Sequence, residues 1–228
     1  MNDELPDHSP PDLRHVETWL FDLDNTLYSP DSGFMAQIEA RMTTFVADVT
    51  GLPGPQAYAL QKRYLAEHGL TLLGLMAEHG VDPDAFHALF HDISLETLAH
   101  DPELLAALRR LPGRRLIFTN ADDVHARRVL EHLGLTEVFE DVFHIASFDY
   151  APKPDPAPFG RIIAEHGVAP AATAFFEDSE RNLEPAAALG MTTVLVGPHA
   201  AESTAPFVNH RARRLAPFLA AAHVKEAA

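Results

Sequence analysis

Polar side chains that could bind a metal ion, phosphate or a proton follow four short apolar runs, at the point where each run ends. They are Asp22 and Asp24 after the first run, Thr119 and Asn120 after the second, Lys153 after the third, and Glu177 and Asp178 after the fourth. Each motif alone has an ordinary structural explanation, because Asp, Asn and Ser also form turns and helix caps, and Pro-Lys-Pro also forms a rigid exposed loop. Their recurrence at one structural place favours a common site.

These residue types suit a phosphoryl group bound beside a divalent cation. Carboxylates placed close together repel one another unless a cation lies among them. Mg²⁺ takes one or two protein carboxylates together with water and phosphate oxygens. Lys153 would supply a positive charge to a phosphate dianion, and the Thr119 hydroxyl and Asn120 amide can donate hydrogen bonds to its oxygens. The set predicts phosphoryl transfer, in which catalysis is mostly positioning and charge neutralisation.

The spacing of the first two acids allows them different tasks. Asp22 and Asp24 stand two residues apart directly after the first apolar run, and we expect their carboxylates to face different partners. One carboxylate can face the metal and the substrate, which leaves Asp24 free to act as general acid or base with its backbone carbonyl available to the metal.

The apolar runs predict the strands that carry these side chains. They are short, rich in aromatic or β-branched residues, and occupy residues 19–21, 116–118, 142–145, 174–176 and 194–196. Such runs are typical of strands buried on both faces of a parallel sheet. Because ligands bind outside the carboxyl ends of the strands in an open parallel sheet, we expect the polar side chains to meet at one edge.

The gap between the first two runs holds more helix than a simple crossover needs. Asp101, Asp122 and Asp155 predict helix N-termini, the first of them within this gap. Residues 30–110 contain several helical patterns, the first of which ends at Gly51. A crossover between parallel strands takes only about a dozen residues. We therefore expect an inserted, all-helical cap.

The chain is predicted to have three parts. Residues 1–14 are polar with three Pro and are expected to form a flexible leader. Residues 15–29 and 111–228 are expected to form an α/β core with a Rossmann-like parallel sheet, in which residues 215–224 form a last docking helix. Residues 30–110 are the expected cap.

Composition narrows the class of partner. The net charge is −16, from 17 Lys and Arg against 33 Asp and Glu, so the basic surface of a nucleic-acid or anionic-membrane binder is missing. The absence of Cys excludes disulfides and thiolate chemistry. No apolar run approaches the roughly 20 residues that span a bilayer, and the acidic, Pro-rich N-terminus is unlike a targeting peptide. We expect a cytoplasmic protein, a monomer or homodimer, that acts on a small molecule.

The motifs resemble those of the haloacid dehalogenase superfamily. Residues 21–28, Phe-Asp-Leu-Asp-Asn-Thr-Leu-Tyr, are similar to its first motif. Thr119-Asn120, Lys153 and Glu177-Asp178 fall where its second, third and fourth motifs stand. The resemblance covers about residues 16 to 200 and implies the haloacid dehalogenase fold, a helical cap and a Mg²⁺-dependent phosphomonoesterase.

The resemblance also implies a role for each residue. Asp22 would be the nucleophile that forms an aspartyl-phosphate, and Asp24 would protonate the leaving oxygen and then activate water. Mg²⁺ would be bound by Asp22, Asp178 and the backbone carbonyl of Asp24, while Glu177 stands where close relatives often carry Asp and its role is open. The phosphoryl group would be held by Thr119, Asn120 and Lys153.

The substrate follows from finer similarities. Dehalogenases lack an Asp two residues after the nucleophile, so Asp24 favours a phosphatase. The first, second and fourth motifs look most like the pyrimidine 5′-nucleotidase branch, which implies pyrimidine nucleoside 5′-monophosphates as substrates. The alternatives are a phosphatase of phosphoglycolate or a sugar phosphate, a mutase, and a catalytically silent phosphate-ligand binder, although a silent relative usually loses the nucleophile or the acid first.

Two features of the cap are open to more than one interpretation. His87 and His91 have the i,i+4 spacing of zinc ligands on a helix, but no Glu accompanies them, and a helix-end pair is the favoured interpretation. His68, Thr71, His91 and Asp92 are candidates for contact with the substrate, against the simpler alternative of a solvated helix face.

Overall fold

The body of the protein is a six-stranded, all-parallel sheet in the order β3-β2-β1-β4-β5-β6. The computed structural model describes residues 10–225. The strands are β1 (Thr18–Phe21), β2 (Arg114–Phe118), β3 (Asp141–Phe143), β4 (Thr173–Glu177), β5 (Thr192–Val196) and β6 (His210–Ala212). The Rossmann-like sheet is confirmed, and all five apolar runs contribute a strand. Strand β6 was not predicted, because His-Arg-Ala is short and mostly polar.

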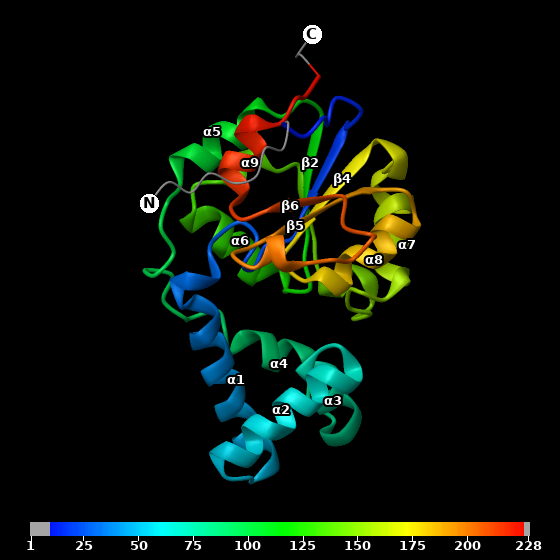
Figure 1. Cartoon of the computed structure of the whole chain (residues 1–228). Coiled ribbons are helices and arrows are strands. Elements are labelled where there is room, and N and C mark those ends of the chain that lie inside the picture. The colour runs from blue at the N-terminus through cyan, green and yellow to red at the C-terminus, as the bar shows by residue number, and fades with distance from the viewer. Residues whose placement is uncertain (1–9, 226–228) are drawn as a thin grey trace.

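The sheet is covered by helices on both faces (Figure 1). Trp19 and Phe21 of β1 pack toward one helical layer, and Leu20 packs toward the other, as alternation along a strand requires. The first layer is α5 (Pro102–Arg110), α6 (Asp123–His132) and α9 (Leu215–Ala221); the second is α7 (Pro156–His166) and α8 (Glu180–Ala188). This double cover explains why the buried parts of β1 to β5 are apolar on both faces.

Strand order reverses beside the central strand. The chain runs from β1 outward through β2 and β3, then returns to place β4 on the other side of β1. The register aligns Phe21 with Phe176, and the amide of Asp22 donates to the Phe176 carbonyl at 2.9 Å. The residues that follow β1 and β4 therefore emerge side by side, where an open parallel sheet binds ligands.

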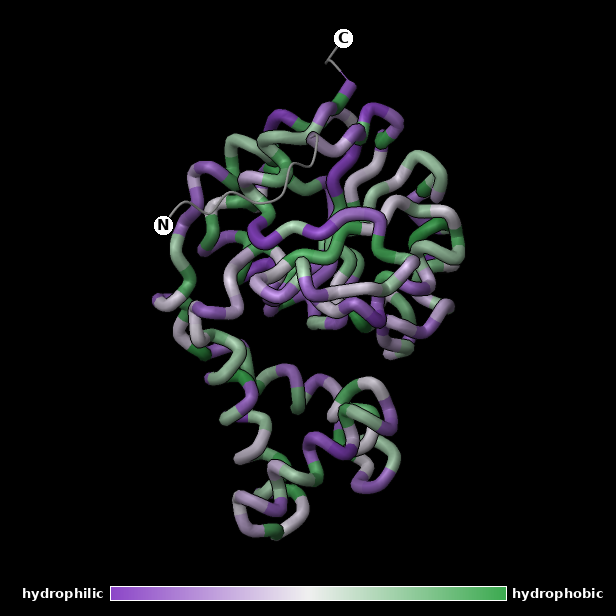
Figure 2. Tube along the Cα trace, in the orientation of Figure 1, coloured by the Kyte–Doolittle hydropathy of each residue, from purple (hydrophilic) through white to green (hydrophobic). Residues whose placement is uncertain are grey.

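Four helices between β1 and β2 form a separate layer beyond the carboxyl ends of the strands (Figure 1). They are α1 (Phe34–Thr50), α2 (Gly54–His68), α3 (Thr71–His79) and α4 (Pro83–Ala88). Helix α1 packs against α2, and α2 against α3. Along the cap, hydrophobic segments alternate with hydrophilic ones (Figure 2), as amphipathic helices require when they bury one face against each other.

The structure differs from the predicted division of the chain at two boundaries, the end of the cap and the end of the leader. Helix α5 was expected in the cap within residues 30–110, but it packs against α9 on the sheet. An amphipathic pattern predicts a buried face but does not say which neighbour covers it. Of the expected leader, residues 1–9 lie outside the described residues. The remainder is docked, since Leu13 is fully buried and its amide donates to the His223 carbonyl at 2.8 Å.

In residues 10–225, no helix combines the length and the apolar character needed to cross a bilayer.

Candidate active site

A cavity of about 290 Å³ lies between the carboxyl ends of the strands and the cap. We call it the strand-end cavity. Its walls from the body include every side chain expected in the site, which are Asp22, Asp24, Thr119, Asn120, Lys153, Glu177 and Asp178. The four motifs therefore converge, as their common place after the strands predicts.

Lys153 is the buried centre of this group, with an exposed fraction of 1%. Its ammonium donates to Asp22 Oδ1 at 2.8 Å, to Glu177 Oε2 at 2.7 Å and to the Phe118 carbonyl at 2.7 Å. Three acceptors use all three N–H donors of an ammonium. Burial alone would lower the pKa of Lys153, but Asp22 and Glu177 raise it above its ordinary value, so the side chain is charged.

Asn120 fixes the backbone of Lys153. Its Oδ1 accepts a hydrogen bond from the Lys153 amide at 2.9 Å, and its Nδ2 donates to the Lys153 carbonyl at 3.1 Å. The sequence predicted Asn120 as a phosphate ligand and missed this contact, because no pattern links residues 33 positions apart. One amide hydrogen of Nδ2 is left for a ligand. The Thr119 side chain is also buried, and its Oγ1 accepts from the Ala121 amide at 3.0 Å.

Three carboxylates face the single ammonium. Burial raises the pKa of Asp22 to about 7, with a further contribution from Glu177 and opposition from Lys153. Burial likewise raises the pKa of Glu177 to about 7 against the effect of Lys153. Burial and Asp22 raise the pKa of Asp178 above its ordinary value. When all three carboxylates are ionised, the site holds more negative charge than Lys153 neutralises, and this repulsion favours either protonation or a bound cation.

The same carboxylates could hold a divalent cation. One oxygen each of Asp22, Glu177 and Asp178 lies within 4.8 Å of the others. The buried Oδ1 atoms of Asn25 and Asn182 have no hydrogen-bond partner, and both residues line the cavity. Oxygen donors with excess negative charge fit Mg²⁺. The expected contribution of the Asp24 carbonyl stays a prediction.

Glu177 has little freedom to leave Lys153. Its Oε2 accepts from the ammonium and its Oε1 accepts from the Ser179 amide at 3.2 Å. Both oxygens of Glu177 thus already accept hydrogen bonds from the protein. Glu177 is also buried, whereas Asp178 is only partly buried and is more accessible from the cavity. This arrangement favours Glu177 as the partner of Lys153 and Asp178 as the carboxylate open to a cation.

Asp24 points to a different set of partners. Its Oδ1 accepts from the Tyr28 hydroxyl at 2.6 Å and lies 2.9 Å from His125 Nε2. Burial would raise the pKa of Asp24, but His125 and the Tyr28 hydrogen bond lower it below its ordinary value. Burial would lower the pKa of His125, but Asp24 raises it. Two carboxylates two residues apart therefore have opposite pKa shifts.

His125 was missed by sequence reasoning. It lies in the first turn of α6, and its amide donates to the N-cap carboxylate of Asp122 at 3.1 Å. Only the orientation of α6 beside β1 brings this ring to Asp24. The available signal was weak: a His three residues after a helix N-cap that itself follows the second motif.

The cap supplies an apolar wall to the cavity. Its members are Met35, Ile38, Met42, Leu65, Leu70, Leu72, Phe86 and Phe90. Of the predicted cap contacts, Thr71 lines the cavity, but its hydroxyl donates to the Gln61 carbonyl at 3.2 Å. His68, His91 and Asp92 are not among the lining residues.

His87 and His91 both contact Asp122. His87 Nδ1 lies 3.3 Å and His91 Nε2 lies 3.1 Å from its two carboxylate oxygens. The pair therefore connects the cap to the N-terminus of α6. Within the described part of the chain, the acidic cluster of Asp22, Glu177 and Asp178 is the only group with three converging metal-ligand atoms.

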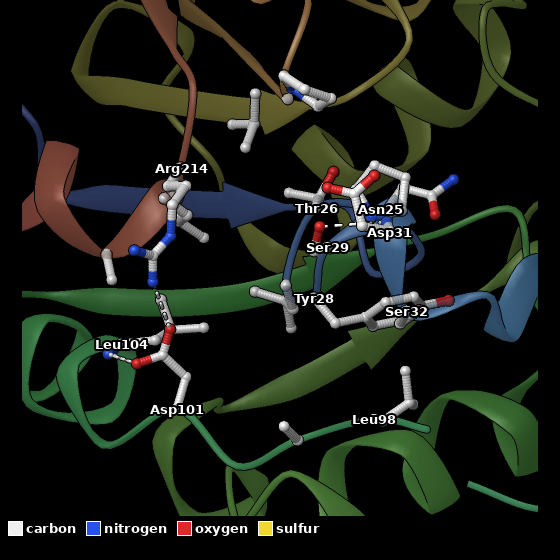
Figure 3. A pocket seen from close by; sticks show the side chains of 18 of the residues that line it. Asn25, Thr26, Tyr28, Ser29, Asp31, Ser32, Leu98, Asp101, Leu104 and Arg214 are labelled. Carbon is white, nitrogen blue, oxygen red and sulfur yellow. Dashed lines mark hydrogen bonds and ion pairs between the residues drawn. The ribbon is translucent and has the colours of Figure 1, made fainter. Parts of the chain in front are cut away.

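A second cavity, of about 730 Å³, lies where the chain passes between body and cap (Figure 3). We call it the linker cavity; its lining comes from residues 25–32, 97–104, 196–198 and 213–216. Asp101 accepts from the Leu104 amide at 3.0 Å as the N-cap of α5 and pairs with Arg214 at 3.7 Å. Every charged side chain that lines this cavity is exposed or half-exposed.

Comparison with solved structures places this fold among haloacid dehalogenase proteins. A HAD phosphatase from Thermococcus onnurineus has a TM-score of 0.59 and 22% identity, over 87% of this chain and 94% of that one. L-2-haloacid dehalogenase from Xanthobacter autotrophicus has a TM-score of 0.57 and 16% identity, over 90% of this chain and 97% of that one. The HAD hydrolase YfnB from Bacillus subtilis, bound to magnesium, has a TM-score of 0.59 and 17% identity, over 87% of this chain and 95% of that one. At these identities the likeness shows the fold, which phosphatases and dehalogenases share.

Sequence comparison gives a curated relative and a family. Phosphate metabolism protein 8 of Saccharomyces cerevisiae is 28% identical over 208 residues, which are 84% of this chain. The chain spans 64% of the length of that yeast protein. The family profile of haloacid dehalogenase-like hydrolases matches residues 16–190, a range that holds all four motifs. The chain belongs to the haloacid dehalogenase-like hydrolases.

Proposed function

We propose that this protein is a Mg²⁺-dependent phosphomonoesterase that works through an aspartyl-phosphate on Asp22. The observation that carries the proposal is the division of labour between the two acids after β1. Asp22 lies against the buried ammonium of Lys153 and beside Asp178, whereas Asp24 is held apart by Tyr28 and His125. One acid is thus placed in the charge-neutralising half of the site, and the other is placed for proton transfer. The reaction needs Asp22 ionised and Asp24 protonated, the reverse of their pKa shifts in the structure. A bound cation would lower the pKa of Asp22, and a phosphate dianion would raise the pKa of Asp24.

In the first step, an Asp22 oxygen attacks phosphorus and the bond from phosphorus to the ester oxygen breaks. The Thr119 hydroxyl and the remaining amide hydrogen of Asn120 donate to the phosphoryl oxygens, Lys153 supplies positive charge beside them, and Asp24 gives a proton to the leaving oxygen. Mg²⁺ bound by Asp22, Asp178 and the Asp24 carbonyl would neutralise negative charge on the phosphoryl group.

In the second step, water attacks the phosphorus of the aspartyl-phosphate. Asp24, now a carboxylate, takes the proton from that water, the bond between phosphorus and the Asp22 oxygen breaks, and phosphate leaves. Asp24 returns to its protonated form and Asp22 to its carboxylate, so both residues are ready for the next cycle.

The proposed substrate is a pyrimidine nucleoside 5′-monophosphate. The resemblance of the motifs supports it, and the apolar cap wall, which includes Phe86 and Phe90, would suit an aromatic base. The name of the yeast relative concerns phosphate metabolism, which agrees with a phosphate ester in general. Phosphoglycolate or a sugar phosphate is the alternative. A cytoplasmic location and a monomeric or homodimeric state stay predictions from the sequence.

Phosphate release from a panel of esters tests this proposal. The panel contains UMP, CMP, their deoxy forms, purine monophosphates, phosphoglycolate and sugar phosphates, each with Mg²⁺ and with chelator. We expect release from the pyrimidine nucleotides that chelator and Asp22→Asn abolish. Release from phosphoglycolate or a sugar phosphate instead would retain the mechanism and overturn the substrate. A folded protein that binds Mg²⁺ in calorimetry but releases no phosphate would be a silent binder.

A further inference from the structure

We propose that Tyr28 and His125 are positioning residues that hold Asp24 by one carboxylate oxygen and so direct its other oxygen to the leaving group and to water. This inference rests on the proposed phosphatase function and adds two residues to it. Neither residue was expected to act on Asp24 from the sequence.

Both donors meet at a single atom. The Tyr28 hydroxyl donates to Asp24 Oδ1 at 2.6 Å, and His125 Nε2 lies 2.9 Å from the same oxygen. No hydrogen bond to Asp24 Oδ2 occurs among residues 10–225. A carboxylate fixed at one oxygen can no longer rotate, so the direction of the other oxygen is fixed too.

The two donors are themselves buried and packed. His125 has an exposed fraction of 3% and Tyr28 one of 8%. The Phe34 ring stacks on the His125 imidazole with a centroid separation of 5.8 Å and an interplanar angle of 19°. It also meets the Tyr28 ring edge to face at 5.8 Å. A single fully buried ring thus supports both donors.

We call the pair of donors, Tyr28 and His125, the Asp24 clamp. Phe34 also connects this clamp to the cap. It is the first residue of α1, where the chain leaves the body. Tyr28 comes from the turn after β1, and His125 comes from α6, so the clamp joins three elements. Its geometry is therefore a property of the assembled body and cap entrance, and not of the first motif alone.

Proton transfer depends steeply on such positioning. A general acid must lie within about 2.6–3.2 Å of the atom that takes its proton, and a misplacement of about 1 Å can cost roughly 100-fold in rate. In the first step the proton on Oδ2 moves to the ester oxygen as the bond to phosphorus breaks; in the second, a proton of water moves to Oδ2. Rotation of Asp24 would impair both transfers without removing the acid.

The test compares two esters that differ in their need for an acid. p-Nitrophenolate leaves without protonation, whereas the alkoxide of a nucleotide or of phosphoglycolate does not. The variants are Tyr28→Phe, which keeps the ring on Phe34, His125→Gln, and the double variant, with Asp24→Asn as reference. The readout is kcat/KM, which reports steps up to the formation of aspartyl-phosphate.

We expect kcat/KM for the alkyl ester, UMP or the ester preferred in the panel, to fall about 10-fold to 100-fold in the double variant. For p-nitrophenyl phosphate we expect a fall of less than about 3-fold, and KM should change little for either ester. Asp24→Asn should show the same selectivity with a larger loss. Equal losses for both esters would indicate a structural role only, and no loss would exclude the clamp; either result overturns the proposal.

A structural measurement separates this proposal from the phosphatase function itself. Failure of the function appears as a wild type that releases no phosphate from any ester. Crystal structures of the wild type and the double variant then still test the clamp. We expect Asp24 in one orientation in the wild type and a different or mixed orientation in the double variant. An unchanged Asp24 in the double variant would overturn the clamp, whatever the activity.

Discussion

The larger of the two cavities has the more exposed charged side chains, and the smaller one has the more buried. The linker cavity has a volume of about 730 Å³ and the strand-end cavity about 290 Å³. The larger one has the Asp101–Arg214 pair, whose side chains are 34% and 64% exposed. The smaller one has the Lys153–Glu177 pair, in which both side chains are 1% exposed.

This difference separates a cavity that follows from the chain path from one that is built for chemistry. Exposed ion pairs contribute little to stability and cost little to form. Buried charges are expensive unless paired, and the strand-end cavity collects several in one place. An arrangement that works against stability in this way is typical of a functional site. Buried charge, rather than volume, therefore favours the strand-end cavity as the candidate active site.

The largest expected effect is on activity. Asp22→Asn removes the proposed nucleophile, so phosphate release should fall at least about 1,000-fold while the fold is retained. Asp31→Asn makes the same chemical change at an exposed side chain of the linker cavity and should leave kcat/KM unchanged. A steady-state assay on the two purified variants measures both. Comparable losses in the two would remove the distinction between the cavities.

The second effect is on stability. Lys153→Met leaves Asp22 and Glu177 buried without their counter-charge, and we expect the free energy of unfolding to fall by about 3–5 kcal/mol at pH 8. Arg214→Met removes an exposed cation of the linker cavity, and we expect a change within about 0.5 kcal/mol. Urea denaturation of both variants provides the comparison. A Lys153→Met protein as stable as the wild type would contradict the buried pairing.

The third effect is on pH dependence without metal. The ordinary pKa values of Asp22 and Glu177 are 3.8 and 4.5, and burial raises both to about 7 in the folded protein. A raised pKa contributes stability that is fully present below the ordinary value and is lost as pH rises through the folded value. The free energy of unfolding in chelator should therefore decrease between about pH 4.5 and pH 7.

Mg²⁺ should oppose this decrease, because binding requires deprotonated carboxylates and stabilises the folded state. Denaturation at pH 5.5 and pH 8, each with Mg²⁺ and with chelator, measures both trends. Asp22→Asn is the control and should show a weaker dependence on pH and on Mg²⁺. Stability that rises over this range in chelator would mean that the carboxylates are better solvated than the structure indicates.

The sequence predicted the parts of the site that follow directly from strand order. Asp22, Thr119 and Asp178 come immediately after strands β1, β2 and β4, so parallel pairing alone brings them together. The contact between His125 and Asp24 spans 101 residues and depends on the rotation of α6 about its axis. A helical period gives that helix a buried face but does not specify which atom its first turn meets.

The same limit applies to the fold. Each of the five apolar strands could be predicted because burial on both faces demands apolar residues. Strand β6 could not be predicted, since residues 210–212 pair at an edge with only Ala212 buried. Helix α5 has a clear N-cap at Asp101, yet its partner α9 begins more than 100 residues later. Local chemistry fixes where an element begins, and tertiary packing decides where it lies.

The smallest effects should come from the linker cavity itself. Asp101→Ala removes the N-cap of α5 and its Leu104 hydrogen bond, so we expect a loss of about 1 kcal/mol in unfolding free energy. Arg214→Ala breaks only the exposed pair and should cost less than about 0.5 kcal/mol. Neither variant should change kcat/KM. A contrary result would be an Arg214→Ala variant that loses less stability than Asp101→Ala but more kcat/KM. The linker cavity would then take part in the reaction, and the contrast with the strand-end cavity would have to be abandoned.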